Sequence, residues 1–156
     1  MKINFFTVNA NDNMGSYRIW IRDLSRSLNE IGHDSNILKE GVEISSLVDC
    51  DTIIFGKSSY SFAPQVKKII ENKNIKMGGI NVEKGHEDKS LDFLIVGSPE
   101  EMCSLHYYDN IFIYPLIERQ FEEVSPKVHK NGESFRICFH GHHPHLFKFE
   151  PFLLRF

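Results

Sequence analysis

The 156-residue sequence has few cysteines and no long apolar run. Cys50, Cys103 and Cys138 are odd in number and widely spaced, which argues against a disulfide framework and fits a reducing compartment. No apolar run approaches the ~20 residues of a membrane-spanning helix, and the N-terminal apolar stretch is too short for a signal peptide. We therefore expect a cytoplasmic protein without a transmembrane segment, and leave peripheral contact with a membrane open.

The sequence also lacks a large net charge and several well-known catalytic and nucleotide-binding motifs. The formal net charge is -3, so we expect no nucleic-acid partner. The absence of a Gly-x-Ser-x-Gly elbow, a P-loop and a full Gly-x-Gly-x-x-Gly fingerprint argues against a lipase, a nucleoside triphosphatase and a standard dehydrogenase. The acid cluster that a receiver domain needs after its first strand is absent too.

The composition that remains is typical of a soluble globular protein. Apolar residues make up 41% and charged residues 25%, and 13 phenylalanines indicate a well-filled core. The length fits one domain and a little more.

Six short apolar segments rich in β-formers predict strands. Several are near-continuous apolar runs, which are typical of strands buried on both faces of a parallel sheet. The segments are 2–8, 34–39, 51–56, 75–82, 91–96 and 111–114, and Gly78-Gly79 interrupts the fourth of them.

Helices are predicted between these strands. The segment 17–31 places apolar side chains on one face and ends before Gly32. Pro64 and Ser98-Pro99 begin two further helices. The alternation predicts an α/β fold, a Rossmann-like parallel sheet with helices on both faces.

The character of the sequence changes after residue 117. Residues 118–134 are charged and contain Pro126 and Gly132, which predicts a linker after a first domain of residues 1–117. Residues 135–156 then predict a strand, a loop and the start of a helix. Such a unit cannot bury its apolar face alone. We expect it to be the beginning of a second, truncated Rossmann-like domain; the alternative is that it docks back on the first sheet.

Four segments of the sequence, 14–33, 91–100, 110–121 and 135–141, by their order and spacing resemble the N-terminal domain of GT-B glycosyltransferases, in particular the large retaining family that includes sucrose synthases. Met14-Gly15-Ser16-Tyr17-Arg18 through Gly32-His33 is similar to the family's Gly-Gly-x-x-Arg … Gly-His opening, with Met14 in place of the first glycine. Segment 110–121 lacks the family's Asn-Gly.

The resemblance implies an acceptor-side domain followed by the start of a nucleotide-sugar domain. The implied reaction transfers a sugar from a nucleotide-diphosphate sugar to an acceptor hydroxyl of a glycan or small molecule, without a cofactor or bound metal. This chain alone is expected to be inactive, because most of the donor domain is missing. The alternative is a non-catalytic Rossmann-like module that binds a glycan or small ligand.

Candidate donor contacts lie in two loops. Gly15 and Ser16 precede a helix N-terminus, which favours an anion, and Arg18 could clamp a diphosphate. The alternative is a plain strand-to-helix turn with a solvated arginine. By the resemblance, the loop with His140, Gly141 and His142 faces the same cleft. Its closely spaced histidines could supply metal nitrogens, but no cysteine or carboxylate pair accompanies them, so we expect no metal site.

Candidate acceptor contacts follow the third predicted strand. Lys57, Ser58 and Tyr60, together with Ser59 between them, could hydrogen-bond a sugar. The alternative is that Ser59 or Ser61 caps a helix here.

The catalytic residue is the least defined of the predicted roles. The resemblance implies a histidine after the fourth strand. His86 and Glu83 are the candidates in that region, and the alternative is that both are ordinary polar residues of an exposed loop.

Overall fold

The computed structural model describes residues 1–82 and 89–115, together with 119, 123, 125, 128 and 130–132. The chain separates into two compact units, Met1–Glu123 and Val124–Phe156. The predicted strand, loop and helix start of residues 135–156 lie outside the described residues.

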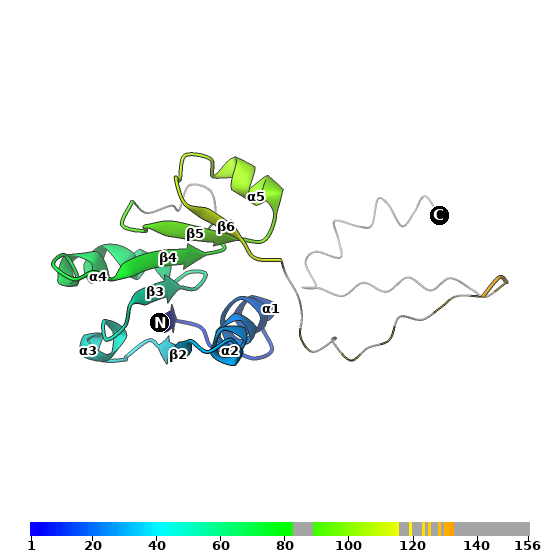
Figure 1. Cartoon of the computed structure of the whole chain (residues 1–156), viewed down its shortest axis with the longest axis horizontal. Coiled ribbons are helices and arrows are strands. Elements are labelled where there is room, and N and C mark those ends of the chain that lie inside the picture. The colour runs from blue at the N-terminus through cyan, green and yellow to red at the C-terminus, as the bar shows by residue number, and fades with distance from the viewer. Residues whose placement is uncertain are drawn as a thin grey trace. The chain divides into compact units, whose positions relative to one another are not determined.

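The described part of the first unit contains a six-stranded, all-parallel sheet. Its strands are β1 (Lys2–Thr7), β2 (Asp34–Lys39), β3 (Thr52–Phe55), β4 (Lys76–Ile80), β5 (Phe93–Val96) and β6 (Ile111–Ile113). They lie side by side in the order β2-β1-β3-β4-β5-β6 (Figure 1). The predicted α/β class with a parallel sheet is therefore confirmed.

The burial of the strands follows their place in the sheet. All four residues of β3 are buried, as are five of the six in β1, because both strands are covered on both faces. The edge strands β2 and β6 are more exposed. This distribution explains why the central strands read as continuous apolar runs.

One continuous helical segment connects β1 to β2. It consists of α1 (Gly15–Tyr17), the π-helical η1 (Arg18–Asp23) and α2 (Leu24–Glu30). Gly32 follows with φ +90°, the left-handed conformation that ends many helices. The segment begins two residues earlier than predicted.

The other helical elements are α3 (Ile44–Leu47), the 3₁₀ turn η2 (Tyr60–Phe62), α4 (Ala63–Ile69) and α5 (Pro99–Ser104). The predicted cap of α5 is present, since the Ser98 Oγ accepts a hydrogen bond from the Glu101 N–H at 3.2 Å. The sequence did not predict α3, whose four residues are too few to show a helical period.

Helices cover both faces of the sheet. Figure 1 shows α1 and α2 on one side and α3 and α4 on the other. The first helical segment packs Trp20 and Ile21 against Phe5, Ile54 and Ile80. On the opposite face α3, α4 and the residues that follow α3, α4 and α5 contribute to a larger core, with the side chains Leu47, Val48, Ala63, Val66, Ile70 and Leu105.

The strand order also locates the place where a ligand fits. From β1 the chain crosses to β2 on one side, and it then returns to β3 on the other side of β1. The connections that leave β1 and β3 consequently diverge at their carboxyl ends. In open α/β sheets a crevice forms at this reversal of strand order.

Candidate functional site

A cavity of about 270 Å³ lies at the carboxyl ends of β1 and β3. Its lining comes from three stretches of chain: the end of β1, the start of the first helix, and the loop after β3. The lining residues are Thr7, Val8, Asn9, Met14, Ser16, Tyr17, Ile21, Lys57 and Ser58. The cavity therefore occupies the crevice that the strand order predicts.

Two hydrogen bonds between Thr7 and Asn9 form a tight turn at the end of β1, which is part of the cavity wall. The Thr7 Oγ1 donates a hydrogen bond to the Asn9 carbonyl at 2.9 Å, and the Asn9 N–H donates to the same Oγ1 at 3.2 Å. Thr7 is buried, whereas Asn9 is exposed. These bonds fix the Asn9 backbone, and the exposed Asn9 side chain lines the cavity.

The loop after β3 is fastened to the loop after β1. The Gly56 N–H donates to the Phe6 carbonyl, and the fully buried Ser59 accepts a hydrogen bond from the Val8 N–H at 3.0 Å through its Oγ. Ser58 between them has φ +67°, a conformation that non-glycine residues rarely adopt. Such strain is often found at functional sites and is held here by its well-anchored neighbours.

Gly56 also allows the helix to approach β3 closely. A Cβ atom at this position would lie 2.9 Å from the Ile21 Cδ1 atom. Because Gly56 has no side chain, the first helical segment can lie close to β3. Ile21 of this segment lines the cavity.

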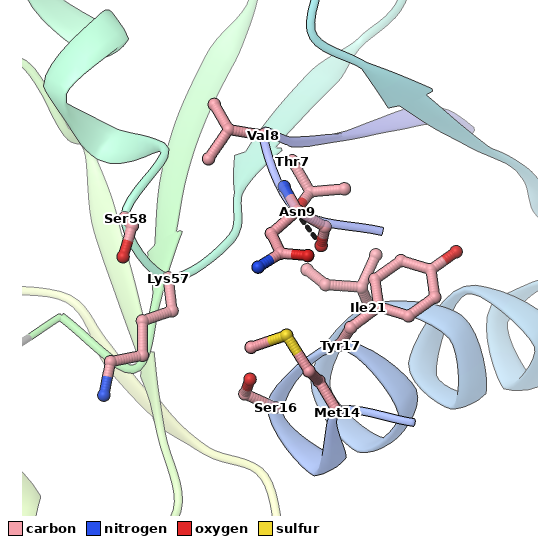
Figure 2. A pocket seen from close by; sticks show the side chains of 9 residues that line it. All are labelled: Thr7, Val8, Asn9, Met14, Ser16, Tyr17, Ile21, Lys57 and Ser58. Carbon is pink, nitrogen blue, oxygen red and sulfur yellow. Dashed lines mark hydrogen bonds between the residues drawn. The ribbon is translucent and has the colours of Figure 1, made fainter. Parts of the chain in front are cut away.

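The first turn of the helix faces the loop after β3. In Figure 2, Lys57 and Ser58 approach the cavity from one side and Met14 and Ser16 from the other, with Asn9 between them. Met14 is the N-cap residue and makes no side-chain capping hydrogen bond. The first N–H groups of a helix lack partners within it, so this end can receive an acceptor atom.

The electrostatics of the cavity favour a neutral or anionic ligand. Lys57 is exposed and contributes its ammonium group, and the described lining residues contain no carboxylate. Burial, and after it the negative charge of Asp12, raise the pKa of the Tyr17 phenol. Tyr17 consequently stays neutral at physiological pH and keeps its hydroxyl hydrogen for donation.

Arg18 holds the loop rather than lining the cavity. Its Nη1 donates to the Asp12 carbonyl at 3.1 Å, and the neighbouring Arg22 pairs with the carboxylates of Asp12 and Asp23, each at 3.0 Å. These bonds tie the loop before α1 to the helix. The predicted diphosphate contact of Arg18 stays a prediction.

The predicted site residues divide into three groups. Ser16, Lys57 and Ser58 line one cavity, although they come from two separate loops, and Gly15 lies beside Ser16 at the helix start. Tyr60 lies in η2, outside the cavity lining, and is half-buried against the larger core. Glu83 and His86, and the loop with His140, Gly141 and His142, lie outside the described residues.

Sequence reasoning missed part of the cavity wall. Asn9, Met14 and Tyr17 were not among the predicted site residues, although Asn9 comes two residues after the end of β1 and so lies at the carboxyl ends of the strands. Ser59 was expected to contact a sugar or to cap a helix. Its Oγ instead accepts a hydrogen bond from the Val8 N–H, a contact between segments far apart in the sequence.

Within the described ranges, no three or more His, Cys, Asp or Glu side chains are grouped so that they could hold a metal ion. The same residues contain no helix that is both long and apolar enough to cross a membrane. Comparisons with protein-family models, curated proteins and solved structures found no match to this chain.

Proposed function

We propose that this chain is the acceptor-side part of a GT-B glycosyltransferase of the retaining type. The enzyme would transfer a sugar from a nucleotide-diphosphate sugar to an acceptor hydroxyl in glycan or glycoconjugate synthesis. The observation that carries the proposal is the cavity at the switch point of the sheet, lined by both the first loop and the loop after β3. Ligands of open α/β enzymes bind at this point of the fold.

The polar groups of the cavity suit the two parts of such a reaction. Lys57 and the first helical N–H groups can stabilise negative charge on a departing diphosphate. Asn9, Ser16 and Ser58 offer hydrogen-bond donors and acceptors of the kind that fix a sugar hydroxyl. The widely spaced cysteines, of which Cys50 and Cys103 are free thiols, support a cytoplasmic location.

A non-catalytic module that binds a glycan or small ligand is the second candidate. Among the described residues that line the cavity there is no carboxylate or imidazole to act as a general acid or base. The cavity could therefore bind a ligand without transforming it.

Release of nucleoside diphosphate separates these candidates. The complete translation product that contains this sequence is incubated with acceptor glycans and a panel of nucleotide-sugar donors. We expect turnover with at least one donor, and Lys57→Ala should lower kcat/KM about tenfold or more, because a charge-assisted hydrogen bond is lost. Lys68→Ala is the matched control, since Lys68 is an exposed lysine of α4 outside the cavity.

Two outcomes would contradict the proposal, the first by refuting the enzyme and the second by refuting its assignment to this cavity. One is the absence of nucleotide release with every donor while a glycan still binds, which favours the binding module. The other is an equal effect of the two lysine substitutions on kcat/KM, which would show that turnover does not depend on this cavity.

A further inference from the structure

A second hollow, of about 500 Å³, lies at the opposite end of the parallel strands from the first cavity. Asp92 immediately precedes β5 and Asn110 immediately precedes β6, so the hollow is at the amino ends of these strands. Its lining residues are Lys89, Leu91, Asp92, Tyr107, Tyr108, Asp109 and Asn110. Because the first cavity is at the carboxyl ends, the two are separate sites.

Two consecutive tyrosines form the aromatic part of this hollow. The rings of Tyr107 and Tyr108 are 5.7 Å apart at 47°, and His106 meets the Tyr107 ring edge-on at 5.8 Å. Tyr107 is nevertheless 52% exposed. Exposing so much of a large ring forgoes burial energy, and the exposed surface is available to a flat apolar face of a ligand.

Polar groups of both signs surround the rings. Asp92 is used by the fold: its carboxylate pairs with Lys67 at 3.1 Å and accepts the Met77 N–H at 2.8 Å. Asp109, by contrast, is exposed, and none of the interactions found among the described residues involves its carboxylate. Lys89 and Asn110 are exposed as well and line the same hollow. The Asn110 Nδ2 donates one hydrogen to the Asp92 carbonyl at 3.3 Å, which leaves its second N–H for a ligand.

We propose that this hollow is a binding site for a neutral pyranose. A pyranose has a face of C–H groups that stacks on an aromatic ring, and its hydroxyls both donate and accept hydrogen bonds. Tyr107 supplies the ring, the Asp109 carboxylate accepts from hydroxyls, and Lys89 and Asn110 donate to them. The volume lies within the range of about 300–1,000 Å³ that is usual for small-ligand sites.

The charges at the hollow favour a neutral sugar over charged ligands. Asp109 and Lys89 carry opposite charges, so the attraction of either group for a phosphate or a quaternary ammonium ion is offset by the repulsion of the other. The hydroxyls of a neutral sugar can donate to Asp109 and accept from Lys89, and a neutral sugar is repelled by neither charge. This hollow would bind a sugar independently of the sugar transfer proposed for the cavity at the carboxyl ends of β1 and β3.

Ligand-observed and protein-observed NMR on the whole chain tests the proposal without a sugar donor. The probes are methyl β-glucopyranoside, methyl β-galactopyranoside and maltotetraose, with choline and inorganic phosphate as charged comparisons. We expect at least one sugar to saturate the protein and to shift the amide signals of residues 107–110. Tyr107→Ala should weaken its binding about tenfold or more, whereas Tyr107→Trp should keep it within about threefold, because the ring face is retained.

Phe112→Ala is the matched control, since Phe112 is an equally exposed aromatic residue that does not line the hollow. It should leave sugar binding unchanged. The proposal is overturned if no sugar binds at about 10 mM, well above the Kd of a weak specific site. It is also overturned if only choline or phosphate binds, or if a folded Tyr107→Ala protein binds sugar as the wild type does.

Discussion

At the scale of single residues, hydrogen bonds within one turn of chain occur together with bonds that join distant segments. The Ser98 cap and the helix end at Gly32 are local features, and both could be predicted from neighbouring residues. The hydrogen bond from the Val8 N–H to the Ser59 Oγ joins residues 51 positions apart. No local pattern predicts this bond, because it depends on β1 and β3 being neighbours.

The Ser59 bond leads to a prediction about stability. Ser59→Ala removes the acceptor of the Val8 N–H at a fully buried position, and should lower the free energy of unfolding by about 1–3 kcal/mol. Urea denaturation measures this change, and hydrogen exchange of the Val8 amide should become faster. Ser61→Ala, at an exposed position two residues later, should change stability by less than about 0.5 kcal/mol. Equal stabilities of the two variants would show that the bond contributes nothing.

At the scale of elements, strands were easier to predict than their details. The central strands lie between helices on both faces, so their sequences are continuously apolar. The weaker prediction, β4, contains Gly78 and Gly79, which looked like an interruption. The structure shows the reason for Gly78: it is paired in register with Phe93 of β5, whose ring occupies the space of a side chain at residue 78.

This packing can be tested by a double-mutant cycle. A Cβ atom at residue 78 would overlap the Phe93 ring, so Gly78→Ala should destabilise the protein by about 1–3 kcal/mol. In a Phe93→Ala background the same substitution should cost less than about 0.5 kcal/mol, since the ring is gone. Chemical denaturation of the four proteins gives the coupling energy. Additive effects would contradict the contact.

The first helical segment shows what a periodic pattern leaves out. The apolar face that includes Tyr17, Ile21 and Leu24 predicted a helix, and these side chains do pack on the sheet. The pattern did not reveal that Arg18–Asp23 is π-helical. A π-helical turn inside a helix is uncommon and often occurs near functional sites, and here it includes Ile21, which lines the cavity.

At the scale of the whole molecule, the sequence predicted the fold class but not the strand order. Alternating strands and helices require a parallel sheet, since parallel strands need crossover connections. The order β2-β1-β3-β4-β5-β6 depends on which side each crossover takes, and no residue pattern records that choice. The order places Ser16, Lys57 and Ser58 around one cavity. The sequence predicted Ser16 as a donor contact and the other two as acceptor contacts, without showing that they lie together.

The central claim is that this cavity, at the switch point of the sheet, receives the diphosphate of a nucleotide sugar. A titration of the ¹⁵N-labelled chain with UDP and with pyrophosphate, followed by NMR, tests it most directly. We predict saturable shifts of the amides of residues 14–17 and 57–59, with binding weakened about tenfold or more by Lys57→Ala and unchanged by Lys68→Ala. No shifts, or shifts at the amino edge of the sheet that both variants retain, would contradict the claim.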